Sequence, residues 1–97
     1  MTEILFHISS EKTGAVFAPL ARACQRNKTS WACFFTGEGV KQLNDIDLVQ
    51  LLSGAERAVA CEHAWHENMG EKKCPLELGS QTNNSEMMTE TTRVISL

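Results

Sequence analysis

Apolar residues gather in short stretches along the chain, and each stretch predicts a strand buried on both faces, as strands of parallel sheets are. The clearest are residues 4–8, 57–61 and 93–97, together with the aromatic-rich residues 29–36. Residues 76–79 predict one shorter strand. The chain therefore supplies enough strands for one small sheet.

In the segments between these strands, apolar residues recur at the spacing of a helix. The first helix is expected to begin near Val16 and end at Arg26, because Pro19 fits only the first turn of a helix. Its apolar face would consist of Val16, Leu20, Ala23 and Cys24.

Later segments predict further helices. A short helical turn is expected over residues 40–43, and a helix capped by Asn44 or Asp45 over residues 46–52. Its apolar face would include Ile46 and Val49.

A helix over residues 62–69 would end at Gly70. Residues 81–84 are predicted to be a polar loop, after which Asn84 or Ser85 would cap the last helix. Strands that alternate with helices predict an α/β fold, a parallel sheet with helices on both faces, in a single domain over residues 1–97.

Composition and charge restrict the class of protein. The chain has 97 residues, 42% of them hydrophobic and 22% charged, which is ordinary for a globular protein. The net charge of −3 and the absence of a basic block argue against nucleic-acid binding. No apolar run approaches the roughly 18 residues of a membrane span. Met1-Thr2-Glu3 lacks the positive flank of a signal peptide, so a cytoplasmic location is expected.

The chain contains four cysteines, and without a signal peptide we expect reduced thiols rather than disulfides. No C-x-x-C occurs, so neither a zinc ribbon nor a thioredoxin-type pair is indicated. Cys24 and Cys33 are predicted to be core residues, and Trp31 and Trp65 are expected in the core or at a subunit interface. Cys74 lies in a loop, where it is an exposed bystander or a second reactive thiol.

Cys61 is the main candidate, because it stands where a predicted strand runs directly into a helix. Ligands and chemistry collect at the carboxyl ends of strands in α/β sheets. The first N–H groups of the following helix also favour a thiolate. The alternative is a buried structural cysteine, since free cysteine is among the most buried residue types.

Glu62, His63, His66 and Glu67 follow Cys61 at spacings that let their side chains meet on a helix. One interpretation is a thiol site whose neighbouring imidazoles move protons. Another is a metal site formed by Cys61, His63 and His66 with a fourth ligand or a water. The third is a solvated helix face with weak ion pairs.

Gly37, Glu38 and Gly39 form a turn at the carboxyl end of the second predicted strand. Two glycines permit close approach of another group to the backbone. The pattern is not the G-x-G-x-x-G of dinucleotide sites, and a plain strand-to-helix turn is the better explanation of these glycines.

Four segments, read in order, resemble one family. They are ILFHIS (residues 4–9), FFTGEGV (34–40), VAC (59–61) before the helix that closes on Gly70, and RVISL (93–97). They resemble the DsrE/DsrF-like family, which includes the TusD-type sulfur-relay subunits. The resemblance implies a three-layer α/β/α fold with a mostly parallel, five-stranded sheet. It also implies assembly into trimers or hexamers.

In sulfur-transferring members of that family, one cysteine accepts sulfane sulfur as a persulfide and passes it on. The matching position is Cys61. The partners would be sulfur donor and acceptor proteins, with no cofactor. The relay subunits usually carry small apolar residues after this cysteine and a basic residue before the glycine. This chain instead has EHAWHENM at residues 62–69, which makes the site more polar and keeps the metal interpretation open.

The leading hypothesis is therefore a sulfur carrier or sulfurtransferase-like protein that uses Cys61. His63 or His66 would assist proton transfer, and residues 37–39 would line the same sheet edge. The alternatives are a non-catalytic oligomeric scaffold of the same fold, in which Cys61 is inert, and a small metal-binding protein.

Overall fold

A computed structural model describes residues 2–97 and contains one five-stranded sheet. All neighbouring strands are parallel, and their order in space is β4-β3-β2-β1-β5. The strands are β1 (Thr2–Ile8), β2 (Trp31–Phe35), β3 (Arg57–Cys61), β4 (Glu77–Gly79) and β5 (Thr91–Ser96). The α-helices are α1 (Gly14–Arg26), α2 (Ile46–Leu51), α3 (Glu62–Met69) and α4 (Gln81–Thr89), and the 3₁₀ helices are η1 (Gly37–Asn44) and η2 (Leu52–Gly54).

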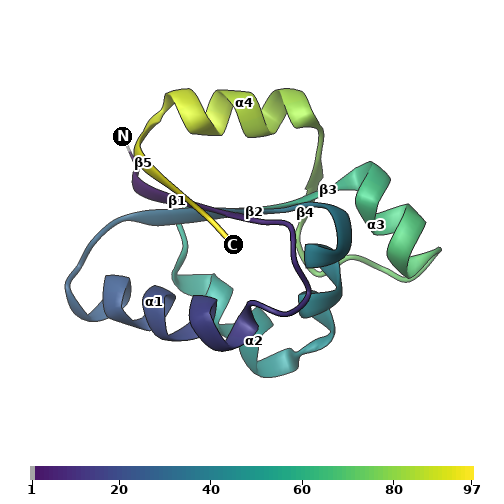
Figure 1. Ribbon diagram of the computed structural model, residues 1–97, viewed down its shortest axis with the longest axis horizontal. Helices are drawn as coiled ribbons and strands as arrows, with labels where there is room; N and C mark the ends of the chain where they lie inside the picture. The colour runs from purple at the N-terminus through teal and green to yellow at the C-terminus, as the bar shows by residue number, and fades with distance from the viewer. Residues whose placement is uncertain (1) are drawn as a thin grey trace.

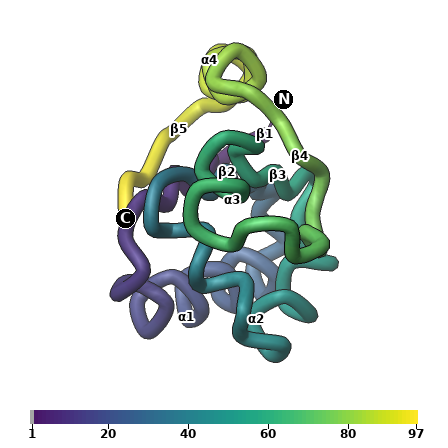
Figure 2. The backbone as a smooth tube through the Cα atoms, turned by 90° about the vertical axis from the view of Figure 1, so that its right-hand side faces the viewer, coloured from purple at the N-terminus to yellow at the C-terminus, as the bar shows by residue number. Residues whose placement is uncertain are grey.

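Helices cover both faces of the sheet, as the alternation of strands and helices predicts. In Figure 1, α1 and α2 lie below the sheet and α4 lies above it. The view turned by 90° in Figure 2 shows the same three layers. Helix α3 lies beyond the carboxyl end of β3 and packs against η1. The fold is thus a small α/β/α domain. None of the helices within residues 2–97 is long and apolar enough to cross a membrane.

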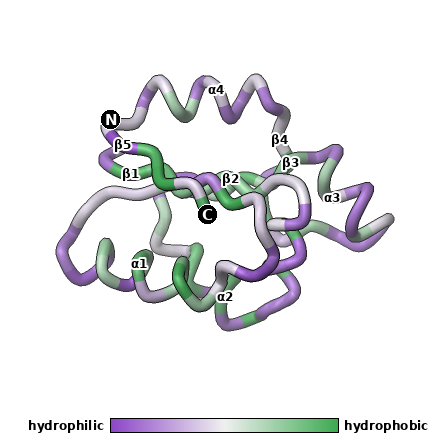
Figure 3. Tube along the Cα trace, in the orientation of Figure 1, coloured by the Kyte–Doolittle hydropathy of each residue, from purple (hydrophilic) through white to green (hydrophobic). Residues whose placement is uncertain are grey.

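The core lies between the central strands and α1. All residues of β2 are buried, and Phe17 of α1 makes edge-to-face contacts with three aromatic rings of β1 and β2. Trp31 and Trp65 are fully buried, which places both in the core. Figure 3 shows hydrophobic positions concentrated in the central strands, whereas α3 and α4 are largely hydrophilic.

Helix α1 differs from expectation in its start and in its buried face. It begins at Gly14, and Pro19 lies inside it. Proline has no backbone N–H, so Pro19 cannot donate a helical hydrogen bond to the carbonyl oxygen of Ala15. Both residues are exposed, and water can donate to that oxygen instead. Phe17, Ala21 and Cys24 face the core, while Val16 is 52% exposed. The large ring of Phe17 fills the space between α1 and the sheet, so α1 is turned about its own axis relative to the expected orientation.

Helix α2 confirms one predicted cap and corrects one predicted face. Asp45 accepts hydrogen bonds from the backbone of Asp47 and Leu48. Leu48 and Leu52 are buried, whereas Ile46 is 72% exposed.

Helix α4 begins earlier than expected. Residues 81–84 are helical rather than a loop, and neither Asn84 nor Ser85 is the cap. Ser80 caps the helix through a reciprocal pair of bonds with Asn83, in which the Ser80 side chain accepts from the Asn83 backbone and the Asn83 side chain accepts from the Ser80 backbone. This cap places Gln81 in the first turn, next to the end of β3.

Candidate functional site

Cys61 stands at the carboxyl edge of the sheet, where three strands end together. It is the last residue of β3, pairs in register with Gly79 at the end of β4, and immediately precedes α3. On the other side, Ala60 pairs with Phe35 at the end of β2. The turn that begins η1 therefore lies beside Cys61, because β2 and β3 are neighbours.

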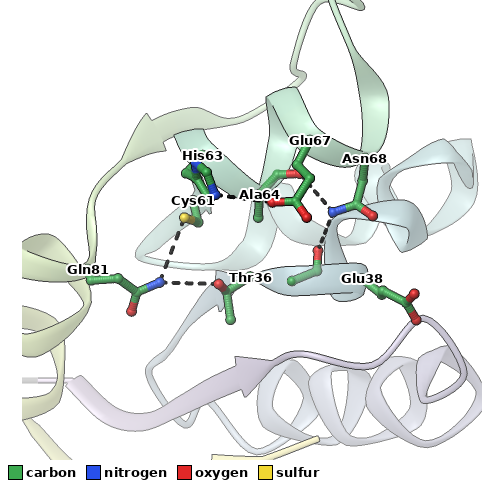
Figure 4. A pocket seen from close by; sticks show the side chains of 9 residues that line it. Thr36, Glu38, Cys61, His63, Ala64, Glu67, Asn68 and Gln81 are labelled. Atoms are coloured by element: carbon green, nitrogen blue, oxygen red, sulfur yellow. Dashed lines mark hydrogen bonds and ion pairs between the residues drawn. The ribbon is translucent and has the colours of Figure 1, made fainter.

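Two adjoining open clefts meet at Cys61. Only 6% of the residue is exposed, yet it lines both clefts, whose volumes are about 450 and 360 Å³. Figure 4 shows the larger cleft, with Cys61 and Gln81 on one side and Glu67 and Asn68 on the other. The larger cleft is lined by Thr36, Gly37, Glu38, Cys61, His63, Ala64, Glu67, Asn68 and Gln81, and the smaller by Cys61, Glu62, His63, Gly79, Ser80 and Gln81.

A side-chain amide reaches the sulfur from α4. Gln81 Nε2 donates hydrogen bonds to Cys61 Sγ at 3.7 Å and to Thr36 Oγ1 at 3.2 Å (Figure 4). Asn84, one turn further along α4 and 94% buried, donates from Nδ2 to Gln81 Oε1 at 3.4 Å. The bond to Oε1 leaves the NH₂ group of Gln81 directed at the sulfur.

Two helices begin close to Cys61. Cys61 is the N-terminal flanking residue of α3, and Gln81 is the first residue of α4. The N-terminal end of a helix carries partial positive charge, so both helices favour a negative charge on the sulfur. A thiol in this position, with an N–H donor in contact, is suited to act as a nucleophile.

His63 lies beside Cys61 as the sequence predicts, because it lines both clefts. Its Nε2 atom lies 3.1 Å from Glu67 Oε2, one helical turn away. Both side chains are well exposed. The ring can therefore exchange protons with water and with a molecule in the cleft.

His66 lies almost one turn further along α3 and has other partners. Its Nδ1 atom lies 3.3 Å from the carbonyl oxygen of Gly70, and its Nε2 atom lies 3.8 Å from Glu62 Oε1. His66 is not among the residues that line either cleft. The structure thus brings His63, but not His66, to the thiol.

Only part of the predicted glycine turn lines the cleft. Gly37 and Glu38 line the larger cleft, and the Gly37 carbonyl accepts a bond from Asn68 Nδ2 at 3.1 Å. Gly37 has a φ of 52°, a backbone conformation that favours glycine. Gly39 is buried beneath the turn, where an added Cβ would overlap the carbonyl oxygen of Ile8. Gly39 is therefore needed for packing and does not line the cleft.

The metal interpretation gains no support from the geometry. Within residues 2–97, no group of three or more His, Cys, Asp or Glu side chains is placed to hold a metal ion. Cys61, His63 and His66 do not converge, because His66 lies outside the cleft.

The other cysteines lie in less reactive surroundings. Burial raises the pKa of the thiols of Cys24, Cys33 and Cys74. Cys24 and Cys33 are core residues, as the sequence predicts, and Cys74 is half-buried. Cys61 differs from all three because it lines the two clefts at the carboxyl edge of the sheet and receives a side-chain hydrogen bond from Gln81.

Three of the residues that build the site are not predicted by the sequence analysis: Thr36, Gln81 and Asn84. Gln81 falls in a segment predicted to be a loop. The one available signal is the strand at residues 76–79, since a strand that pairs with β3 brings the residues after it to the edge that holds Cys61.

Comparison with known proteins adds no relative: no family model, curated protein or solved structure matches the chain.

Proposed function

We propose that this protein is a cytoplasmic sulfur carrier of the DsrE/DsrF-like kind, which accepts sulfane sulfur on Cys61 and passes it to the thiol of a partner protein. The observation that supports this most directly is the position of Cys61 Sγ. It lies where β3 meets α3, lines two open clefts and accepts a hydrogen bond from Gln81. The short segments that resemble the family support the same proposal.

The reaction needs no external oxidant or reductant. The Cys61 thiolate attacks the terminal sulfur of a donor persulfide, R–S–SH, forming a new S–S bond while the donor's S–S bond breaks. The donor leaves as a thiolate, R–S⁻, and takes up a proton. In the second step an acceptor thiolate attacks the terminal sulfur on Cys61 and carries it away, which regenerates the Cys61 thiolate.

The described side chains around the sulfur have separate roles in this scheme. Gln81 donates to the sulfur and stabilises its negative charge. His63, exposed at the mouth of both clefts, exchanges the proton that the leaving thiolate takes up. The turn at Gly37 and Glu38 forms the wall that faces an incoming partner.

Intact-mass spectrometry after incubation with a small-molecule persulfide donor tests the proposal. Wild type should gain one sulfur atom that dithiothreitol removes, and Cys61→Ser should gain none. Cys74→Ser is the matched control and should gain the sulfur as wild type does. A wild-type protein that gains no sulfur, or a Cys61→Ser variant that gains as much, would contradict the proposal.

A second feature favours self-association, as in an oligomeric carrier or a scaffold. Strand β5 is an edge strand of the sheet, and an apolar groove of about 220 Å³ runs beside it. The groove is lined by Ile4, Phe6, Leu20, Ala23, Cys24, Asn27, Thr29 and Ile95. We propose that a second copy of the chain covers this edge. Unpaired edges and apolar grooves are the surfaces that associating chains use.

Native mass spectrometry of wild type and Leu20→Glu tests that proposal. Leu20 lines the groove, so its charged replacement should dissociate the oligomer. Val16→Glu is the matched control, because Val16 is an exposed apolar residue of the same helix that does not line the groove. A wild-type protein that is monomeric at micromolar concentration would exclude this interface.

A further inference from the structure

We propose that the donor and acceptor thiols that exchange sulfur with Cys61 are carried on cationic segments, in which basic side chains flank the reacting cysteine. Small anions such as thiosulfate and thiols in acidic segments would then be poor partners. This inference rests on the proposed carrier function of Cys61 and adds the chemical class of its partners.

Carboxylates are the permanently charged side chains that line the two clefts, and His63, whose Nε2 lies 3.1 Å from Glu67 Oε2, is the basic group beside them. Glu38 and Glu67 line the larger cleft, and Glu62 lines the smaller. No lysine or arginine is among the described residues that line either cleft. The chain nevertheless has nine such residues, so basic side chains are available and lie elsewhere.

Several of the basic side chains have partners outside the clefts. Lys41 Nζ lies 4.0 Å from Glu11, and Arg57 forms a two-bond pair with Glu77. Lys72 Nζ donates to Asn44. These partners hold positive charge away from the residues that surround Cys61.

The site therefore combines two electrostatic environments. At the bottom, the starts of α3 and α4 and the Gln81 amide favour a thiolate or persulfide anion. At the mouth, exposed carboxylates such as Glu62 and Glu67 repel an incoming anion and attract an incoming cation. A cysteine flanked by lysine or arginine satisfies both, since its sulfur reaches the bottom while its basic groups meet the carboxylates.

The experiment measures the rate at which Cys61 reacts with three methanethiosulfonate reagents that carry a trimethylammonium, a sulfonate or a neutral methyl group. In each reaction the thiolate attacks the sulfenyl sulfur, a disulfide forms and methanesulfinate leaves. Peptide mapping by mass spectrometry resolves Cys61 from the other cysteines. Each rate is divided by that of N-acetylcysteine with the same reagent, which removes intrinsic differences in reactivity.

At low ionic strength, the corrected rate of Cys61 with the cationic reagent should exceed the rate with the anionic reagent by about tenfold. That factor is at the lower end of the rate enhancements found for clefts lined by one sign of charge. The ratio should fall towards one in 1 M NaCl, where the Debye length is about 3 Å. The double variant Glu38→Gln/Glu67→Gln should remove most of the preference. Glu86→Gln/Glu90→Gln is the matched control, because it changes the net charge equally near the far end of α4 and should keep the preference.

The outcomes separate this inference from the carrier proposal. If Cys61 reacts but shows the same corrected rate with both charged reagents, or prefers the anion, the cationic partner is excluded while the carrier proposal stands. If the Glu86/Glu90 variant loses the preference as fully as the Glu38/Glu67 variant, net charge and not the cleft is responsible, and the inference is also excluded. If Cys61 reacts with none of the reagents, including the neutral one, the carrier proposal fails and this inference with it.

Discussion

Replacing Gln81 by leucine removes the side-chain amide that contacts Cys61 Sγ and leaves an apolar side chain, one heavy atom shorter, on the helix. The lost bond is long, at 3.7 Å, and Gln81 is exposed to solvent. Hydrogen bonds to charged groups contribute roughly 1.5–3 kcal/mol and neutral ones about 1 kcal/mol, and because this bond is long and exposed we use the lower value of about 1 kcal/mol. That energy corresponds to about a fivefold smaller thiolate population at a pH where the thiol form predominates.

The rate of reaction changes by less than the thiolate population. A thiolate that is less stabilised is a better nucleophile, with a Brønsted coefficient of about 0.4–0.5. A fivefold loss of thiolate is thus partly offset by about a twofold gain in its reactivity. The net expectation at a pH low enough for the thiol form to predominate is a Gln81→Leu variant that reacts about 2.5-fold more slowly than wild type.

At a pH high enough to ionise the thiol in both proteins, the expectation reverses. The variant should react about twofold faster than wild type there, since only the gain in nucleophilicity remains. The assay is the rate with methyl methanethiosulfonate at each pH, read at Cys61 by peptide mapping. Gln50→Leu is the matched control. It makes the same change at an exposed position of α2 and should leave both rates unaltered.

The reversal distinguishes stabilisation of the thiolate from simple access. If leucine merely blocked or opened the cleft, both rates would move in the same direction. A Gln81→Leu variant that is slower at both pH values, or unchanged at both, would refute the role assigned to the amide.

Two further substitutions and the alkylation rate of one cysteine have defined outcomes. Gly39→Ala should lower the free energy of unfolding by about 2 kcal/mol, as overpacked cores do, because the new Cβ would overlap the Ile8 carbonyl oxygen; a urea titration without loss would contradict this packing. Glu77→Gln should cost less than about 1 kcal/mol at pH 7 because the pair with Arg57 is half-exposed. Arg57 lowers the pKa of Glu77, so this stabilisation is present above the usual glutamate pKa of about 4.3 and is lost as the pH falls through the lower value of the folded state. The urea midpoints of wild type and variant should therefore converge as the pH falls below the usual glutamate value, and a gap that stays constant as the pH is lowered would contradict the assignment. Cys74, whose thiol pKa burial raises, should be alkylated at pH 7 more slowly than free cysteine, and an equal rate by peptide mapping would refute that expectation.

Much of the architecture follows from the sequence, because the parallel sheet requires uninterrupted apolar strands that stand out from their surroundings. The junction at Cys61 is the clearest case. The apolar run of β3 gives way to polar residues with helix-forming tendency, and Gly70 ends the helix with a φ of 64°. The boundaries of β3 and α3 agree with the prediction for that reason.

Helix α4 shows why part of the site is not predictable in the same way. Its first residues are uniformly polar, so no apolar period marks a helix. The start is set by the bonds between Ser80 and Asn83 and by burial of Met87 against the sheet. The position of Gln81 beside Cys61 depends on that cap and on the pairing of β4 with β3, which are tertiary features.

Sequence spacing also does not decide which of the two histidines, or which of the two glycines in the turn, lines the clefts. His63 and His66 are three positions apart on one helix, and helical spacing alone permits both to approach Cys61. Packing of α3 against η1 decides that only His63 lines the clefts. Likewise Gly37 and Gly39 look equivalent in sequence, but one lines the cleft and the other lies against β1.

The transfer of one isotopically labelled sulfur atom through the protein tests the central claim most directly. Cys61 would be loaded from a ³⁴S-persulfide donor, the donor removed, and a thiol peptide with flanking lysines added. The account predicts that mass spectrometry finds the label first on the Cys61 peptide and then on the acceptor, in equal amounts, with no label on either in Cys61→Ser. Label that never reaches Cys61, or that reaches the acceptor equally well through Cys61→Ser, would contradict the account.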